Sequence, residues 1–129
     1  MQKSVPARIA VVARDEAVRD SLALLLNAAG CIALPFRSGA AFLAAPTAWR
    51  ADCLVLDGEI DDMTAWEMLD RLRELGSTMK VALFTAKLSP DLLQRAAQAG
   101  ISQVLEAPLI AAGLMEFVGR SRTNGTRGA

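Results

Sequence analysis

The chain has 129 residues, of which 53% are hydrophobic and 22% are charged, and this supplies a full core for one compact domain. Its 14 basic and 14 acidic residues balance, so the composition offers no general attraction to nucleic acid or to an acidic membrane surface. The chain has no histidine, which excludes histidine-based catalytic triads, histidine-ligated zinc and phosphohistidine chemistry. We expect neither a membrane span nor a signal peptide. Cys31 and Cys53 lie in separate apolar segments, as buried thiols in a reducing cytoplasm do.

Short apolar runs alternate along the chain with segments of helical period. The apolar runs predict five strands, at Ile9–Ala13, Cys31–Phe36, Cys53–Leu56, Val81–Phe84 and Gln103–Leu105. The helices predicted after them run over Glu16–Ala29, Gly39–Ala45, Thr64 or Ala65 to Leu75, Pro90–Ala99 and Leu109–Gly119. Glycine follows three of these helices, at Gly30, Gly76 and Gly100.

The spacing of apolar residues predicts which side of each helix faces the core. In the first helix these residues are Val18, Leu22, Leu25 and Leu26, in the third Leu69, Leu72 and Leu75, and in the last Leu114, Phe117 and Val118.

Five strand–helix units in one small domain predict a doubly wound parallel sheet with helices on both faces. A strand order of 2-1-3-4-5 would place the second strand at an edge, where Pro35 is tolerated because it cannot donate to a neighbouring strand. We expect this domain to occupy residues 1–120, followed at 121–129 by a flexible tail or the start of a linker. Ligands of such sheets bind beyond the carboxyl ends of the strands.

Two polar residues stand out at those strand ends. Asp57 follows four apolar residues, where a carboxylate is costly unless it has partners or a chemical role. The alternative is a carboxylate that merely caps the following loop. Thr85 ends the next strand, and a carboxylate beside a hydroxyl suits a phosphoryl group, with one nucleophile and one donor.

From about Arg8 to about Arg120 the chain resembles a response-regulator receiver domain. The resemblance is carried by DEAVRDSLALLLNAAG, RSGAAFLAA, LVLDGEIDDMTAWEML, LFTA and LEAPL, in that order. It implies a flavodoxin-like fold of five strands and five helices, with Asp57 as phosphoacceptor and Thr85 as the phosphate-binding and switch hydroxyl. It also implies that the backbone carbonyl of Glu59 binds a metal and that Pro108 stands where the family's proline follows a lysine through a cis bond. The implied reaction is reversible transfer of a phosphoryl group from the histidine of a partner kinase, using Mg²⁺.

The chain departs from this pattern at four functional positions. Ala13 and Arg14 stand where the family has two acidic residues, Ala107 stands in place of a lysine, and Val104 in place of the aromatic switch. Ala65 in place of a glycine is a lesser departure.

These departures predict a degraded metal site. Mg²⁺ usually needs one or two protein carboxylates, and here Asp57 is the only one expected at the metal position, with the Glu59 carbonyl as a second residual candidate. Arg14 would bring a permanent cation there instead. One hypothesis is a bidentate Arg14–Asp57 ion pair; the alternative is that Arg14 turns to solvent. Asp15 is expected to begin the first helix rather than to replace a metal ligand.

The sequence therefore predicts a cytoplasmic receiver-type domain of a two-component phosphorelay, not an enzyme, with weak, metal-independent or absent phosphorylation. No cofactor is expected, although weak Mg²⁺ binding is compatible with the residual donors. The alternative is a pseudo-receiver that serves protein–protein interaction or dimerisation. Expected partners are a histidine kinase or another signalling protein and a second copy of the chain, without nucleic acid or membrane. Candidate contact residues, each of which could instead be core, are Trp49, Trp66, Leu92, Leu93, Val104, Met115 and Phe117.

Overall fold

The computed structural model describes residues 5–48, 50–106 and 117–119. Its strands are β1 (Arg8–Val12), β2 (Ile32–Phe36), β3 (Cys53–Asp57), β4 (Lys80–Thr85) and β5 (Gln103–Glu106). Its helices are α1 (Glu16–Ala28), α2 (Gly39–Leu43), α3 (Ala65–Glu74) and α4 (Pro90–Gln98). Of the predicted last helix, residues 117–119 are described and are helical, whereas 109–116 lie outside the described residues.

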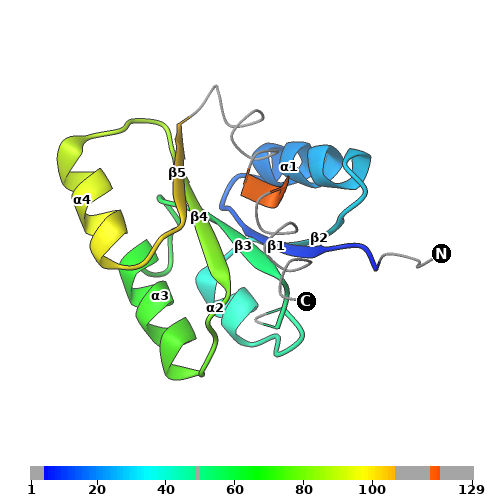
Figure 1. Ribbon diagram of the computed structural model, residues 1–129, viewed down its shortest axis with the longest axis horizontal. Coiled ribbons are helices and arrows are strands. Elements are labelled where there is room, and N and C mark those ends of the chain that lie inside the picture. Colours follow the sequence, from blue (N-terminus) through cyan, green and yellow to red (C-terminus); the bar gives the residue numbers. More distant parts are fainter. Residues whose placement is uncertain (1–4, 49, 107–116, 120–129) are drawn as a thin grey trace.

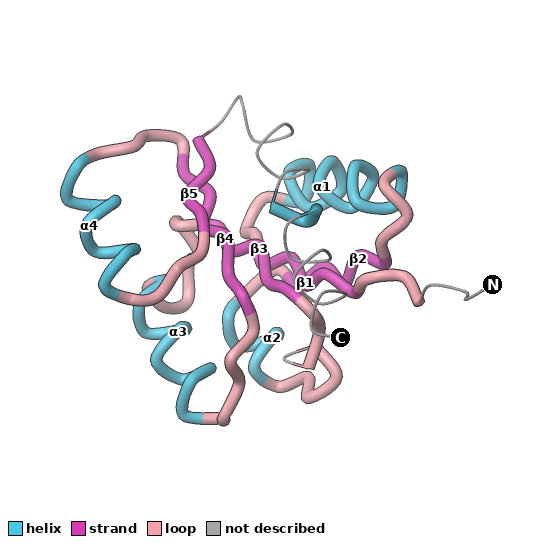
Figure 2. Tube along the Cα trace, in the orientation of Figure 1, coloured by secondary structure: helices cyan, strands magenta, loops and turns pink. Residues whose placement is uncertain are grey.

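The five strands form one parallel sheet in the order β2-β1-β3-β4-β5, which confirms the predicted topology. β2 pairs with β1 alone, so Pro35 lies on an edge strand as predicted. Figure 1 shows α1 and residues 117–119 on one face of the sheet and α2 and α3 on the other. The tube in Figure 2 shows the loops that follow the strands crossing to these helices.

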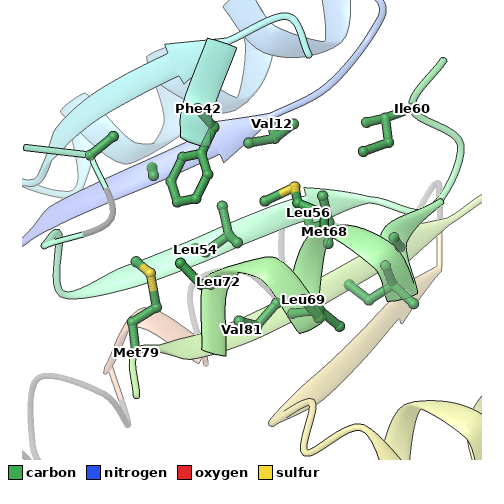
Figure 3. Packing of buried hydrophobic residues seen from close by; sticks show 14 of the residues in the cluster. Val12, Phe42, Leu54, Leu56, Ile60, Met68, Leu69, Leu72, Met79 and Val81 are labelled. Carbon is green, nitrogen blue, oxygen red and sulfur yellow. The ribbon is translucent and has the colours of Figure 1, made fainter. Parts of the chain in front are cut away.

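Each face of the sheet has its own core because successive strand residues point to opposite sides. Ile9, Val11 and Val55 pack against Leu22 and Leu26 of α1 on one face. On the other face, residues of the central strands pack against α2 and α3, as Figure 3 shows for Val12, Phe42, Leu54, Leu56, Met68, Leu69 and Leu72.

Helix ends follow local signals that the sequence carries. Asp15, Ser38, Thr64 and Ser89 each cap a helix by accepting a hydrogen bond from a backbone N–H of the first turn. The glycines predicted to end helices have positive φ, 84° at Gly30, 87° at Gly76 and 79° at Gly100.

One predicted core position is wrong. Leu75 is 45% exposed, while Leu69 and Leu72 are buried as predicted. Each step of three residues falls short of a full helical turn by about 60°, so the side chain two steps beyond Leu69 lies about 120° from it. In addition, α3 ends at Glu74 and Leu75 is its C-cap.

No described helix has both the length and the apolar character that crossing a membrane requires.

Candidate functional site

The carboxyl ends of β3 and β4 bring Asp57 and Thr85 to one edge of the sheet. Asp57 is the last residue of β3 and pairs in register with Phe84, the residue before Thr85. Ala13 directly follows β1, which lies on the other side of β3. The residues predicted to share a site from β1, β3 and β4 therefore do lie on neighbouring strand ends.

The carboxylate of Asp57 is half-buried and is held by the loop that follows it. Its Oδ1 accepts a hydrogen bond from the backbone N–H of Glu59 at 2.8 Å. Burial raises the pKa of Asp57, while hydrogen bonds from the backbone N–H groups of Glu59 and Arg14 and the charge of Arg14 partly offset this effect. The group therefore accepts a proton more readily than an exposed aspartate does.

Arg14 does not pair with Asp57, so the ion-pair hypothesis is wrong. Its Nη1 instead donates to Oδ1 of Asp61 at 3.1 Å, and the side chains of these two residues are 54% and 69% exposed. The hydrogen bond and the charge of Asp61 raise the pKa of Arg14, and Asp57 and Glu59 add to this effect by their charges. The guanidinium thus lies within electrostatic reach of three carboxylates and forms its hydrogen bond with that of Asp61. The alternative, that Arg14 turns to solvent, holds only in part, because the exposed guanidinium is bound to Asp61.

The backbone that carries Arg14 is fixed by a residue that the sequence interpretation missed. Nη1 of Arg19 donates to the carbonyl oxygens of Ala13 at 2.8 Å and of Arg14 at 2.9 Å. The N–H of Ala13 donates to the carbonyl of Phe36 at 3.1 Å. Asp15 accepts from the N–H of Val18 at 3.2 Å, so it begins α1 as predicted.

Asp62, next to the partner of Arg14, holds the start of α2. Its two carboxylate oxygens accept from the N–H groups of Gly39 at 3.1 Å and Ala40 at 2.8 Å. Desolvation raises the pKa of Asp62, but these two hydrogen bonds, a further one from the backbone of Asp62 itself and the charge of Arg71 together outweigh it, so that the pKa is lowered overall. The consecutive acids Asp61 and Asp62 in GEIDDMT are the sequence signal that could have indicated the contacts with Arg14 and with the start of α2.

The hydroxyl of Thr85 is bonded within its own loop. Its Oγ1 accepts from the N–H of Lys87 at 3.2 Å and lies 3.3 Å from the carbonyl oxygen of Lys87, to which it donates. Glu106, opposite Thr85 in register, accepts from the N–H of Leu88 at 3.2 Å through Oε2. Both interactions order the loop between β4 and α4.

The candidate contact residues divide between core and surface. Phe117 is buried at 2% exposure, and Leu92 packs against the core of the α3 face. Leu93 is 46% exposed, and Val104 is partly exposed on β5. Trp66 packs against the core while the guanidinium carbon of Arg95 lies 4.8 Å from its ring centroid.

Four of the predicted site and contact residues, Trp49, Ala107, Pro108 and Met115, lie outside the described residues, as does the predicted core residue Leu114. Cys31 and Cys53 are both buried, as expected.

The acidic residues near Asp57 are dispersed. Within residues 5–48, 50–106 and 117–119, no three histidine, cysteine, aspartate or glutamate side chains group as a metal site would require. The carboxylates of Asp61 and Asp62 are engaged by Arg14 and by α2.

The sheet order and the carboxylate at the end of the central strand define a flavodoxin-like α/β domain whose site lies at the carboxyl edge. A match to the response regulator receiver domain covers residues 9–118. The chain therefore belongs to this family, and it is a receiver domain of two-component signalling.

One curated relative and two solved structures illustrate the similarity. The transcriptional regulatory protein FixJ of Azorhizobium caulinodans is 33% identical over an alignment of 129 positions, which covers 97% of this chain and 60% of that protein. The chain thus spans about three fifths of the length of this relative. A CheY-like receiver domain protein from Methanospirillum hungatei has a TM-score of 0.85 at 21% identity, covering 97% of this chain and 100% of that one. Chemotaxis protein CheY4 of Vibrio cholerae has a TM-score of 0.82 at 21% identity, covering 91% and 99% respectively.

Proposed function

We propose that this receiver domain relays its signal with weak, metal-independent or absent phosphorylation of Asp57. The observation that carries the proposal is the pair Ala13 and Arg14, which puts a methyl group and a cation on the strand end beside Asp57. The guanidinium already supplies a positive charge to the surrounding carboxylates, and a divalent ion would be repelled by it.

The donors near Asp57 do not fit Mg²⁺. This ion demands near-octahedral oxygen coordination and usually takes one or two carboxylates from the protein. Asp57 is half-buried and accepts a hydrogen bond from Glu59, and the nearby Asp61 is bound to Arg14. We therefore propose that the site has no resident cofactor, and that the Glu59 carbonyl is at most a residual donor.

A second candidate function is a pseudo-receiver that acts only by binding other proteins. Thr85 and Val104 favour it: the hydroxyl is engaged with Lys87, and the residue on β5 has no aromatic ring to reorient. In both cases the domain is not an enzyme by itself.

The partners we propose are a histidine kinase or another signalling protein, together with a second copy of the chain. The similarity to FixJ, which is named a transcriptional regulatory protein, supports a regulatory role in the cytoplasm. The balanced charge supports a domain that makes no direct contact with nucleic acid or membrane.

Intact mass after incubation with a small phosphodonor, with and without Mg²⁺, tests this proposal. We expect the phosphoryl adduct of the wild-type protein to be scarce and insensitive to Mg²⁺. The Ala13→Asp/Arg14→Asp variant restores two carboxylates and is expected to gain an Mg²⁺-dependent adduct. Asp57→Asn is the control for the site of attachment.

A wild-type adduct that requires both Mg²⁺ and Asp57 would contradict the proposal. A metal-independent adduct that disappears in Asp57→Asn would favour phosphorylation over the pseudo-receiver. No wild-type adduct in either condition would favour the pseudo-receiver.

A further inference from the structure

The loop between β3 and α3, residues 58–64, is attached to two other elements by two consecutive carboxylates. Asp61 binds the guanidinium of Arg14, in the loop after β1, with an N–O distance of 3.1 Å. Asp62 accepts from the backbone N–H groups of Gly39 and Ala40, at the start of α2. We refer to residues 58–64 as the strap.

At α2 the attachment is close and specific. An added Cβ on Gly39 would lie 2.9 Å from Sδ of Met63, so the start of α2 is close enough to the strap that a larger residue there would require the Met63 side chain to shift. Ser38 accepts from the N–H of Ala41 at 3.0 Å, and Asp62 takes the two preceding N–H groups. The first turn of α2 therefore depends on a carboxylate from the strap as well as on its own N-cap.

At Arg14 the attachment is exposed and replaceable. Arg19 fixes the backbone of the β1–α1 loop, which leaves the Arg14 side chain as the part that can change partner. Both side chains of the Arg14–Asp61 pair are more than half exposed, and such pairs are weak and screened by salt. The same guanidinium is also attracted by the charges of Asp57 and Glu59.

We propose that the strap transmits the charge state of the Asp57 site to α2, because added negative charge at Asp57 draws Arg14 away from Asp61 and loosens the hold of Asp62. A phosphoryl group carries close to two negative charges and binds guanidinium groups well, so it competes strongly with one exposed carboxylate. This inference depends on the proposed function in one respect, because phosphorylation of Asp57 is the source of the added negative charge. In this proposal Thr85 and Val104 take no part, and α2 is the helix that responds to added charge at Asp57.

Amide hydrogen exchange measured by NMR on the unphosphorylated protein tests whether the strap couples Arg14 to α2, without any phosphoryl chemistry. Arg14→Ala and Asp61→Asn should each speed exchange at Gly39 and Ala40 by roughly two- to five-fold, as expected for the loss of an exposed ion pair. The double variant should exchange no faster than either single variant, because both remove the same contact. Asp62→Asn should have a larger effect, roughly ten-fold, because it weakens the direct acceptor.

Three controls make the result specific. Asp70→Asn, on the exposed side of α3, should leave exchange at Gly39 and Ala40 unchanged. The amide of Leu83 in the buried strand β4 reports global unfolding and should not respond to any of the exposed substitutions. At about 1 M salt the wild-type protein should exchange at the rate of Asp61→Asn, since the ion pair is screened.

The proposal would be overturned if Gly39 and Ala40 exchanged at the wild-type rate in both Arg14→Ala and Asp61→Asn while Asp62→Asn exchanged faster. Faster exchange in the single variants, equal to that in the double variant, would support it. These measurements need no adduct on Asp57. The absence of phosphorylation and the absence of coupling between Arg14 and α2 are therefore separate results.

Discussion

At the scale of single residues, Asp57 combines a place at the centre of the sheet with a carboxyl group that is hard to ionise. Burial is the largest cause of its raised pKa, and the hydrogen bond from Glu59 only partly offsets it. An unfolded chain restores the ordinary pKa. Between the two pKa values the folded protein therefore binds the proton more readily than the unfolded one does. The stability that this group contributes is complete below the unfolded pKa and is lost as the pH rises through the folded pKa.

Asp57→Asn should consequently make the protein more stable at neutral pH. The amide removes the buried charge, and its oxygen can still accept the hydrogen bond from Glu59. After solvent screening at this half-exposed site, we expect a gain of less than about 1 kcal/mol in the free energy of unfolding. The gain should shrink towards zero at about pH 3, below the ordinary aspartate pKa of 3.8. Urea denaturation of both proteins at the two pH values measures it, and a variant less stable than wild type at neutral pH would contradict this assignment.

Arg14 shows how far residue-level interpretation extends. Its presence at the acidic-pair position was visible in the sequence, and so was its consequence for a metal site. Its partner was not, because Asp57 and Asp61 lie close together in one segment, at the end of β3 and in the loop after it. Asp57 is half-buried and already bonded, whereas Asp61 is open to solvent, where the guanidinium keeps its hydration.

At the scale of elements, the helices begin where their capping residues predict. α3 is the clearest case, because Thr64 and Glu67 form a capping box in which each side chain accepts a hydrogen bond from the backbone of the other. This box sets the end of the strap and the first turn of the helix that covers the second core.

Thr64→Ala should therefore destabilise the domain by about 1 kcal/mol, the usual cost of losing a threonine N-cap. The midpoint of urea denaturation measures the change, and far-ultraviolet circular dichroism confirms that the helix content is retained. Thr78→Ala is the matched control, since Thr78 is exposed in the loop before β4 and caps no helix. Equal stability of the two variants would show that the capping box does not contribute.

At the scale of the whole molecule, stability rests on two cores separated by one sheet. Alternate residues of the same strands belong to different cores, as Val55 and Leu54 do. The outer surface also carries apolar residues, of which Leu24 on α1 is 71% exposed.

Leu54→Ala should cost about 2–5 kcal/mol, because Leu54 is fully buried between β3 and the α2–α3 layer and its truncation leaves a cavity. Leu24→Ala removes the same atoms from the surface and should change the stability by less than about 0.5 kcal/mol. Chemical denaturation of the two variants measures the difference. Similar losses for both substitutions would indicate that Leu24 is covered by another chain in solution.

The sequence by itself determined the strand order, the edge position of β2, the capped helix starts and the neighbouring positions of Asp57 and Thr85. These features follow from local periodicity and from the parallel topology, which brings all carboxyl ends to one edge. The burial of Leu75 was mispredicted because it lies where α3 ends and the helical face has rotated away.

Only the tertiary structure decided which acid Arg14 binds, which carbonyls Arg19 holds and which helix Asp62 caps. The contacts of Arg14 and Asp62 join segments far apart in sequence, with separations of 47 residues for Arg14 and Asp61 and 22 for Ala40 and Asp62. The contacts of Arg19 are local in sequence, but they depend on the path that the loop after β1 takes. Burying apolar side chains leaves a clear pattern in the sequence. The choice among several exposed partners of opposite charge depends instead on small differences in loop geometry and solvation, which no residue pattern encodes.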